Sequence, residues 1–155
     1  MAIKIDKRHF ELIEAYGEGA YPNECCGFLL GKENNGEKEV LSTLPAFNAQ
    51  EEEELYHRFL ITPADFLRAQ RFASERGMEI VGFYHSHPDA PARPSRYDLE
   101  HGWPWYSYII VSVSQRKAAD LTSWVLQDDR LKFRREQLIL LRPKEVANKQ
   151  NLVHA

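Results

Sequence analysis

The segment EIVGFYHSHP, residues 79–88, constrains the fold more than any other part of the chain. It is apolar through its first half, carries His85 and His87 near its end and finishes at Pro88. A short apolar run bounded by turn residues is typical of a buried strand, and a proline limits further pairing in a sheet. Side chains at positions i and i+2 of a strand point to the same face. The two histidines are therefore predicted to project together from the end of a buried strand.

The segments on either side predict a mixture of strands and helices. Residues 6–20 have the pattern of an amphipathic helix, and a second helix is predicted to end before Gly77, with Thr62 as its N-cap and Pro63 at its first position. Further strands are predicted at 25–31, 38–47, 55–61, 107–113 and 121–127, and a short helix near Ser95. This order combines hairpins with one strand–helix–strand crossover. It favours an α+β fold, with a mixed β-sheet flanked by helices, over a parallel doubly wound fold.

Length and composition indicate one domain, predicted to span residues 1–142, followed by a polar tail at 143–155. The net charge of −3 gives no general attraction to nucleic acid or to an anionic membrane. No apolar run approaches the roughly 18–20 residues that cross a bilayer, and the first residues lack a secretory apolar segment. We therefore expect a cytoplasmic protein with neither a nucleic-acid partner nor a membrane partner. The acidic run from Glu51 to Glu54, which also contains Glu52 and Glu53, is expected to be a solvated loop, and its role is open.

The only cysteines, Cys25 and Cys26, are neighbours in the chain. Adjacent cysteines rarely form a disulfide with each other. We expect both thiols to act as small buried apolar side chains rather than as redox or metal-binding groups.

His85 and His87 have two interpretations when they are considered alone. Strand ends often carry histidines that have no function. Alternatively, two imidazoles on one face and a carboxylate from the next loop could hold zinc through three protein ligands, which leaves a fourth position for water in a catalytic site. Asp98 is the candidate carboxylate, but Ser95 and Asp98 also fit a helix capping box. The two interpretations share Ser95 and compete for the oxygens of Asp98.

A catalytic zinc site needs a base, and Glu24 in YPNECCGFLLG is the upstream candidate, although an isolated glutamate is usually a surface residue. Glu24 is followed by His85-Ser86-His87-Pro88 and by Ser95-x-x-Asp98, with ten residues between the second histidine and the aspartate. This combination resembles the JAMM (MPN+) metalloprotease motif. The resemblance covers about residues 5–136 and is greatest to the compact prokaryotic branch of that family.

The resemblance implies a mixed sheet flanked by helices, akin to the cytidine-deaminase-like architecture. It also implies a hydrolase of peptide or isopeptide bonds that depends on one Zn²⁺ per chain. Carried over to this sequence, His85, His87 and Asp98 match the metal ligands. Glu24 matches the general base, and Ser95 matches the serine that helps to stabilise the oxyanion. The substrate bond is expected at the C-terminus of a ubiquitin-like, sulfur-carrier protein.

Two other classes of function stay open. A non-catalytic MPN-like scaffold would bind partners, but such members usually lack the ligands that this chain retains. RadC-like proteins share His-x-His and Ser-x-x-Asp and act with nucleic acid, yet no basic stripe with interleaved aromatics is present here. The zincin pattern His-Glu-x-x-His and the Pro-Cys-x-x-Cys half of the deaminase pattern are both absent.

The remaining candidates are residues near the predicted helix start. His101 is expected near the metal without binding it, or on the surface, because a fourth protein ligand would close the site. Trp103, Trp105 and Tyr106 are expected in the core or at its rim, where exposed aromatics could receive a substrate tail.

Overall fold

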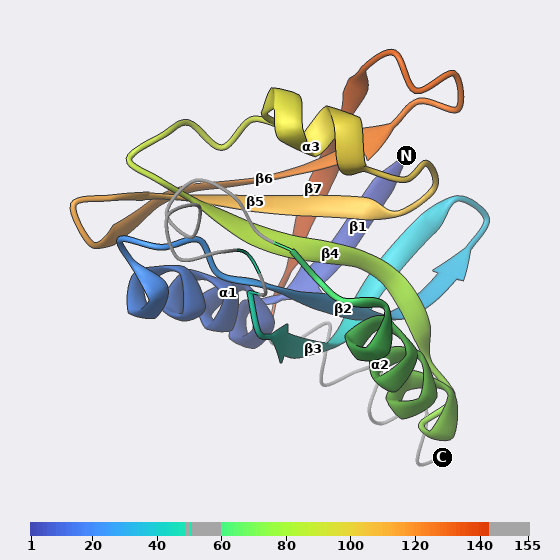
Figure 1. Cartoon of the computed structure of the whole chain (residues 1–155). Coiled ribbons are helices and arrows are strands. Elements are labelled where there is room, and N and C mark those ends of the chain that lie inside the picture. Colours follow the sequence, from blue (N-terminus) through green and yellow to red (C-terminus); the bar gives the residue numbers. More distant parts are fainter. Residues whose placement is uncertain (49, 51–59, 143–155) are drawn as a thin grey trace.

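The structure is a computed structural model that describes residues 1–48, 50 and 60–142. Within these residues the chain forms seven strands and three helices (Figure 1). In chain order they are β1 (Ala2–Asp6), α1 (Lys7–Ala20), β2 (Cys26–Asn34), β3 (Glu37–Ala46), α2 (Pro63–Glu75), β4 (Glu79–Pro88), α3 (Arg96–His101), β5 (Ser107–Ser114), β6 (Lys117–Leu126) and β7 (Phe133–Leu141).

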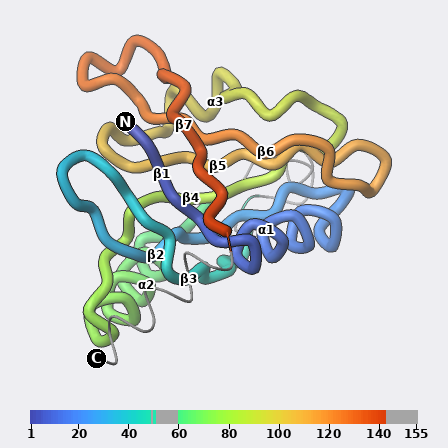
Figure 2. Tube along the Cα trace, turned by 180° about the vertical axis from the view of Figure 1, so that it is seen from behind, coloured from blue at the N-terminus to red at the C-terminus, as the bar shows by residue number. Residues whose placement is uncertain are grey.

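The strands close into a barrel in the order β1-β3-β2-β4-β5-β6-β7. The sheet is mixed, as predicted, because β4 pairs antiparallel with β2 and parallel with β5. The closure was not predicted, since β1 is a five-residue strand that continues directly into α1 and was not recognised in the sequence. It pairs in parallel with both β3 and β7, and Figure 2 shows β1 and β7 side by side. The mixed sheet that the sequence predicts is therefore present, but it closes into a barrel.

Helix α1 begins where predicted, with Asp6 as its N-cap accepting a hydrogen bond from the backbone of His9. It buries Ile13 and Gly17 against one face of the sheet. A Cβ atom at Gly17 would lie 3.0 Å from a methyl carbon of Val113, which is tighter than almost all real contacts. The glycine therefore lets the end of α1, and the loop that follows it, lie close against the strands that carry the site.

Helix α2 covers the opposite face of β2 and β4. Its start agrees with the sequence prediction, because Thr62 accepts a hydrogen bond from the Asp65 backbone and Pro63 occupies the first turn. Ala69 and Ala73 are fully buried, and they belong to a second core cluster that is separate from the one under α1. Its other fully or largely buried members are Phe28, Leu30, Ile80, Phe83 and Tyr108.

A turn around Asn35 and Gly36, both with positive φ angles, joins β2 to β3. The strand predicted at 55–61 falls mainly outside the described residues, and residues 60 and 61 are not in a strand. The acidic run 51–54 and the tail 143–155 also lie outside them. No helix in the described ranges has both the length and the apolar character needed to span a membrane.

Candidate metal centre

His85 and His87 lie on one face of β4, as the alternation of strand side chains predicts. Neighbouring strands hold β4 on both sides at this point, because His85 is paired with Cys26 of β2 and with Ile110 of β5. Both histidines are buried, with 0% and 8% of their surface exposed. Their Nε2 atoms are 3.1 Å apart. Pairing with β2 and β5 at His85, and with Ser112 of β5 at His87, therefore fixes the relative positions of the two imidazoles.

The contact of the Nδ1 atom of His87 indicates which of its two ring nitrogens carries the proton. The Nδ1 atom of His87 lies 2.9 Å from the carbonyl oxygen of Pro91. A carbonyl oxygen can only accept a hydrogen bond, so Nδ1 carries the proton in this contact. In the neutral ring, Nε2 then has a free lone pair that faces His85.

Asp98 joins the histidines from the first turn of α3. The capping box predicted from the sequence is confirmed, because Ser95 Oγ accepts from the Asp98 backbone at 3.1 Å and Asp98 Oδ2 accepts from the Ser95 backbone at 2.8 Å. The same Oδ2 lies 3.2 Å from the Nε2 atoms of both His85 and His87. The two interpretations of Asp98 are therefore compatible, since the cap itself directs the carboxylate oxygen toward the imidazoles.

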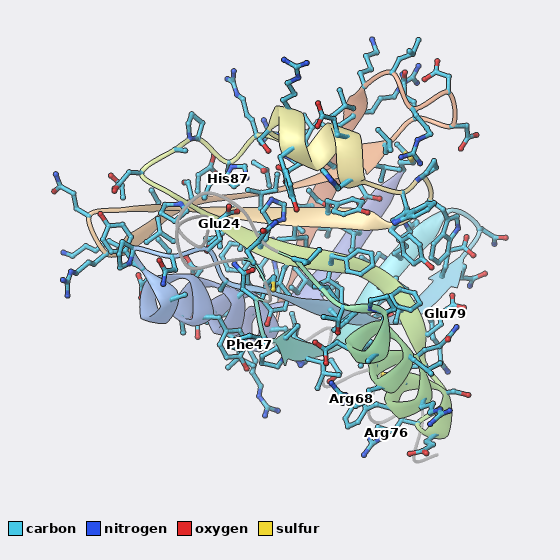
Figure 3. The ribbon with its side chains drawn as sticks, viewed as in Figure 1. Glu24, Phe47, Arg68, Arg76, Glu79 and His87 are labelled. Atoms are coloured by element: carbon cyan, nitrogen blue, oxygen red, sulfur yellow. The ribbon has the colours of Figure 1, made fainter. Side chains whose placement is uncertain are left out.

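Glu24 reaches the same place from the loop between α1 and β2. It is 4% exposed, and one of its carboxylate oxygens and single ring nitrogens of His85 and His87 all lie within 4.8 Å of one another. Figure 3 shows Glu24 and His87 close together although they come from different elements. Glu24, His85, His87 and Asp98 are called the histidine cluster below.

Two hydrogen bonds fix the Glu24 loop to the histidine strand. The backbone N–H of Cys25 donates to Ser86 Oγ at 2.8 Å, and the Ser86 N–H donates to the Cys25 carbonyl at 3.1 Å. Ser86 lies between the two histidines and Cys25 follows Glu24 directly, so these bonds set the position of the Glu24 backbone relative to both rings. Asn48 adds a third bond, from its side-chain amide to the Glu24 carbonyl at 3.2 Å.

Burial and neighbouring charges shift the protonation of the histidine cluster. Burial raises the pKa of Glu24 to about 8, with His87 opposing this shift and Asp98 adding to it. Burial also lowers the pKa of His85. Burial alone would lower the pKa of His87, but the hydrogen bond and the charge of Asp98 outweigh burial, so the pKa of His87 is raised. Burial alone would raise the pKa of Asp98, yet both histidines hold this pKa well below its usual range. Asp98 is therefore a carboxylate, while Glu24 can gain or lose a proton near neutral pH.

Ser95, the predicted oxyanion residue, is an exposed N-cap beside Asp98. Its oxygen accepts the capping bond, so its O–H remains able to donate. His101 lies on the exposed side of α3, where Nδ1 is 3.0 Å from the Tyr97 carbonyl and the two rings stack. It takes no part in the histidine cluster. Burial raises the pKa of Cys25 to about 11 and of Cys26 to about 12, which fits the prediction that these thiols are not reactive.

A cavity of about 680 Å³ opens next to Asp98. Most of its lining is apolar or aromatic and comes from α2, α3, β4, β5 and the β6–β7 turn. It is lined by Leu60, Ile61, Thr62, Pro63, Phe66, Phe83, Tyr97, Asp98, Glu100, His101, Gly102, Trp103, Tyr108 and Arg130. Of the aromatics noted in the sequence, Trp103 lies at this cavity, and Trp105 is exposed nearby in the chain. Sequence reasoning did not identify Tyr108 or Arg130, because strand packing and turn geometry bring them here.

Comparisons with known proteins place the chain in a family. The model of the prokaryotic homologues of the JAB domain matches residues 6–127. Over 107 residues the chain is 35% identical to a desampylase of Pyrococcus furiosus, covering 68% of each protein. Over 102 residues it is 32% identical to a desampylase of Haloferax volcanii, covering 65% of this chain and 70% of the relative.

A solved structure is similar over most of the chain. The solution structure of a protein from Salinibacter ruber is 40% identical, with a TM-score of 0.71, over 91% of this chain and 93% of that one. The chain therefore belongs to the family of prokaryotic homologues of the JAB domain, which confirms the resemblance found in the sequence. The more distant likeness to cytidine deaminases stays a prediction.

Proposed function

We propose that this protein is a zinc-dependent hydrolase of peptide or isopeptide bonds. In this proposal His85, His87 and Asp98 bind one Zn²⁺ per chain, and Glu24 is the general base. The observation that carries it is the convergence of two imidazole nitrogens and a carboxylate oxygen, with a second carboxylate beside them, in a buried position.

The separations between these atoms fit zinc. In a tetrahedral site with metal–ligand bonds of about 2.0–2.1 Å, the ligand atoms lie roughly 3.3 Å from one another. The two Nε2 atoms and Asp98 Oδ2 are 3.1–3.2 Å apart. Two imidazoles and one carboxylate are a usual zinc ligand set, and three protein ligands leave a position open for water. When bound, zinc would act as a Lewis acid and lower the pKa of water toward ~7.

The residues of the chain would divide the proton transfers between them. The Glu24 carboxylate would accept the proton of the attacking water and later return it to the leaving amine. Its raised pKa describes the metal-free protein, and a cation nearby would favour the ionised form. The Ser95 O–H would donate to the oxygen that becomes negative as the carbonyl is attacked.

The proposed substrate is the C-terminal region of a ubiquitin-like, sulfur-carrier protein. Its support is the name desampylase that two relatives carry, together with the largely apolar cavity beside Asp98. An extended tail with small residues could approach the cluster closely in such a cavity. The scaffold alternative is less favoured, because this chain brings all four predicted cluster residues together. The cytoplasmic location and the absence of nucleic-acid and membrane partners stay predictions.

Intact-mass analysis tests the proposal. The zinc-loaded protein is incubated with ubiquitin-like proteins of its own cell, either conjugated to a lysine or extended at the C-terminus. Loss of the attached group or of the extension is expected, and the Glu24→Gln variant is the matched control. Failure of the zinc-loaded wild-type protein to cleave any of these substrates would overturn the proposed function.

A further inference from the structure

The cavity beside Asp98 is also lined by residues of β4 and β5 that lie away from the histidine cluster. His87 is paired with Ser112, whereas Phe83 and Tyr108, which both line the cavity, are paired with each other closer to the start of β5. Phe83 and His87 are four residues apart on β4, which corresponds to about 13 Å at a rise of roughly 3.3 Å per residue. The cavity lining thus includes Asp98 of the histidine cluster as well as residues near the start of β5, and the separation of Phe83 from His87 along β4 equals about four extended residues.

Three exposed residues lie in the segment after α3 and in the β6–β7 turn, and two of them, Trp103 and Arg130, also line the cavity. Trp103 and Leu131 are large apolar side chains with 62% and 74% of their surface exposed. Arg130 precedes Leu131 in the β6–β7 turn, and its guanidinium lies 5.4 Å from the centre of the Trp103 ring. Trp103, Arg130 and Leu131 are called the platform below.

Hydrogen bonds attach the platform to the floor of the cavity. Arg130 donates to the Gly102 carbonyl at 2.8 Å, which joins the β6–β7 turn to the segment after α3. The Trp103 backbone N–H donates to the Tyr108 hydroxyl at 2.9 Å, and Tyr108 lines the cavity. The platform is therefore held in a fixed relation to the cavity, and Figure 1 shows the β6–β7 turn next to α3.

We propose that the platform binds the folded body of the ubiquitin-like substrate whose C-terminal tail lies in the cavity. This inference rests on the proposed function. A folded domain cannot enter a cavity of this size, so it must contact the enzyme where the tail leaves it, about four residues before the bond that is cleaved. Trp103 and Arg130 line the cavity as well as the platform, so the two surfaces are continuous.

The chemistry of the platform indicates what the partner offers. Trp and Arg are the residues most enriched in the energetic centres of protein interfaces. Trp103 and Leu131 fit an apolar patch near the root of the tail. The guanidinium of Arg130 has five N–H donors, and the one hydrogen bond found for it among residues 1–48, 50 and 60–142 leaves others for a carboxylate. The partner surface is thus an apolar patch with an acidic residue beside it.

Two other exposed apolar residues lie away from the cavity. Phe47 is 79% exposed, but it lies by β3 and α2 and does not line the cavity, and Figure 3 shows it away from His87. Leu140 is 48% exposed on β7 and is also absent from the cavity lining. Leu140→Ser therefore serves as a control, because it makes the same change in polarity as Leu131→Ser at an exposed position outside the platform.

Steady-state kinetics on two substrates test the inference. One is the ubiquitin-like protein that the wild-type enzyme cleaves, and the other is a synthetic peptide that copies only its last residues across the same bond. For Leu131→Ser, the ratio of kcat/KM for the protein to that for the peptide is expected to fall about tenfold, because Leu131 does not line the cavity in which the peptide binds. The fall should come from KM of the protein substrate, and Leu140→Ser should keep the wild-type ratio within about twofold.

The possible outcomes separate the two proposals. If the wild-type enzyme cleaves both substrates and Leu131→Ser keeps the wild-type ratio, the platform is overturned and the proposed function stands. A zinc-loaded wild-type enzyme that cleaves neither substrate overturns both. Zinc content and thermal unfolding of each variant show that the comparison is made between folded, loaded enzymes.

Discussion

Two clusters of charged side chains are buried in the same barrel, and they differ in how their polar atoms are paired. The second cluster, called the lysine cluster, joins β3, β5, β6 and β7 and consists of Lys38, Ser107, Ser123 and Glu136. Lys38 Nζ donates to Ser107 Oγ at 3.0 Å, and it also donates to the Trp105 carbonyl. Ser107 and Ser123 donate to the same Glu136 oxygen at 2.6 and 2.9 Å. Each of these contacts matches a donor with an acceptor, and the cluster contains one charge of each sign.

The histidine cluster has the opposite arrangement. Two ring nitrogens and a carboxylate oxygen face one another at 3.1–3.2 Å, with the Glu24 carboxylate beside them. These groups are chiefly acceptors, and without a metal only protons can lie between them. Matched donors and acceptors satisfy buried groups and stabilise a fold, whereas converging lone pairs define a site for a cation. The pairing of polar atoms therefore supports a structural role for the lysine cluster and the proposed metal-binding role for the histidine cluster, without reference to any motif.

Glu24→Gln should have the largest effect on turnover. The amide cannot accept the proton of the attacking water, so kcat should fall by about 10² to 10⁴. Zinc content and thermal stability of the loaded enzyme should stay close to those of the wild type, because Glu24 is proposed as the base and not as a ligand. Kinetics together with elemental analysis check this. Turnover at the wild-type rate would mean that another group is the base.

Ser95→Ala should have the next largest effect. Loss of the O–H donor is expected to lower kcat by about 10² to 10³ with little change in KM, because the bond forms mainly in the transition state. Loss of the cap should also lower the free energy of unfolding by about 1 kcal/mol. Ser95→Asn retains a capping side chain and serves as the control. If the Ser95→Ala enzyme is destabilised but has a normal kcat, Ser95 acts only as a helix cap.

Lys38→Met should separate the two clusters. It leaves the Glu136 carboxylate buried without its cation, so the free energy of unfolding should fall by about 3 kcal/mol. The double variant Lys38→Met/Glu136→Met, which leaves no unpaired charge, should recover part of that loss. Denaturant unfolding measures both changes, and each variant should still bind zinc. Loss of zinc from folded Lys38→Met would show that the two clusters are not independent.

The pH dependence of stability sharpens the same comparison. In the metal-free protein, burial raises the pKa of Glu24 from 4.5 to about 8. Between these values the folded state keeps a proton that the unfolded chain releases, so this residue makes stability fall as the pH rises. We expect wild-type protein to lose about 2 kcal/mol more than Glu24→Gln between pH 5 and pH 7. Thermal unfolding of both proteins, freed of metal by a chelator, measures the difference. Parallel pH profiles would contradict the burial of an ionisable Glu24.

Local patterns explain what could be predicted of the site from the sequence. The alternation of side chains placed His85 and His87 on one face, and the Ser95 capping box placed Asp98 at a helix start. Glu24 carries no local signal of its own, so it could be named only as an upstream candidate, and its role as the base was implied by the resemblance to a known motif. Its position depends on the contact between Cys25 and Ser86, which are 61 residues apart in the chain.

Non-local contacts explain what the sequence did not reveal. Barrel closure depends on β1, whose five residues are too few for a strong periodic signal and whose partners lie more than 30 and more than 130 residues away in the chain. Lys38 stands in the polar segment EKEV, where the sequence gives no sign of burial. Arg130 reaches Trp103 only because the β6–β7 turn folds back onto the segment after α3.

Zinc content tests the central claim most directly. Wild-type protein and the double variant His85→Ala/His87→Ala are loaded and desalted in the same way, and zinc per chain is measured by elemental analysis. Lys38→Met provides the matched control, because it alters the other buried cluster. The account predicts one zinc per chain in the wild type and in Lys38→Met, and none in the double histidine variant. Stoichiometric zinc in the double histidine variant, or none in the wild type, would contradict it.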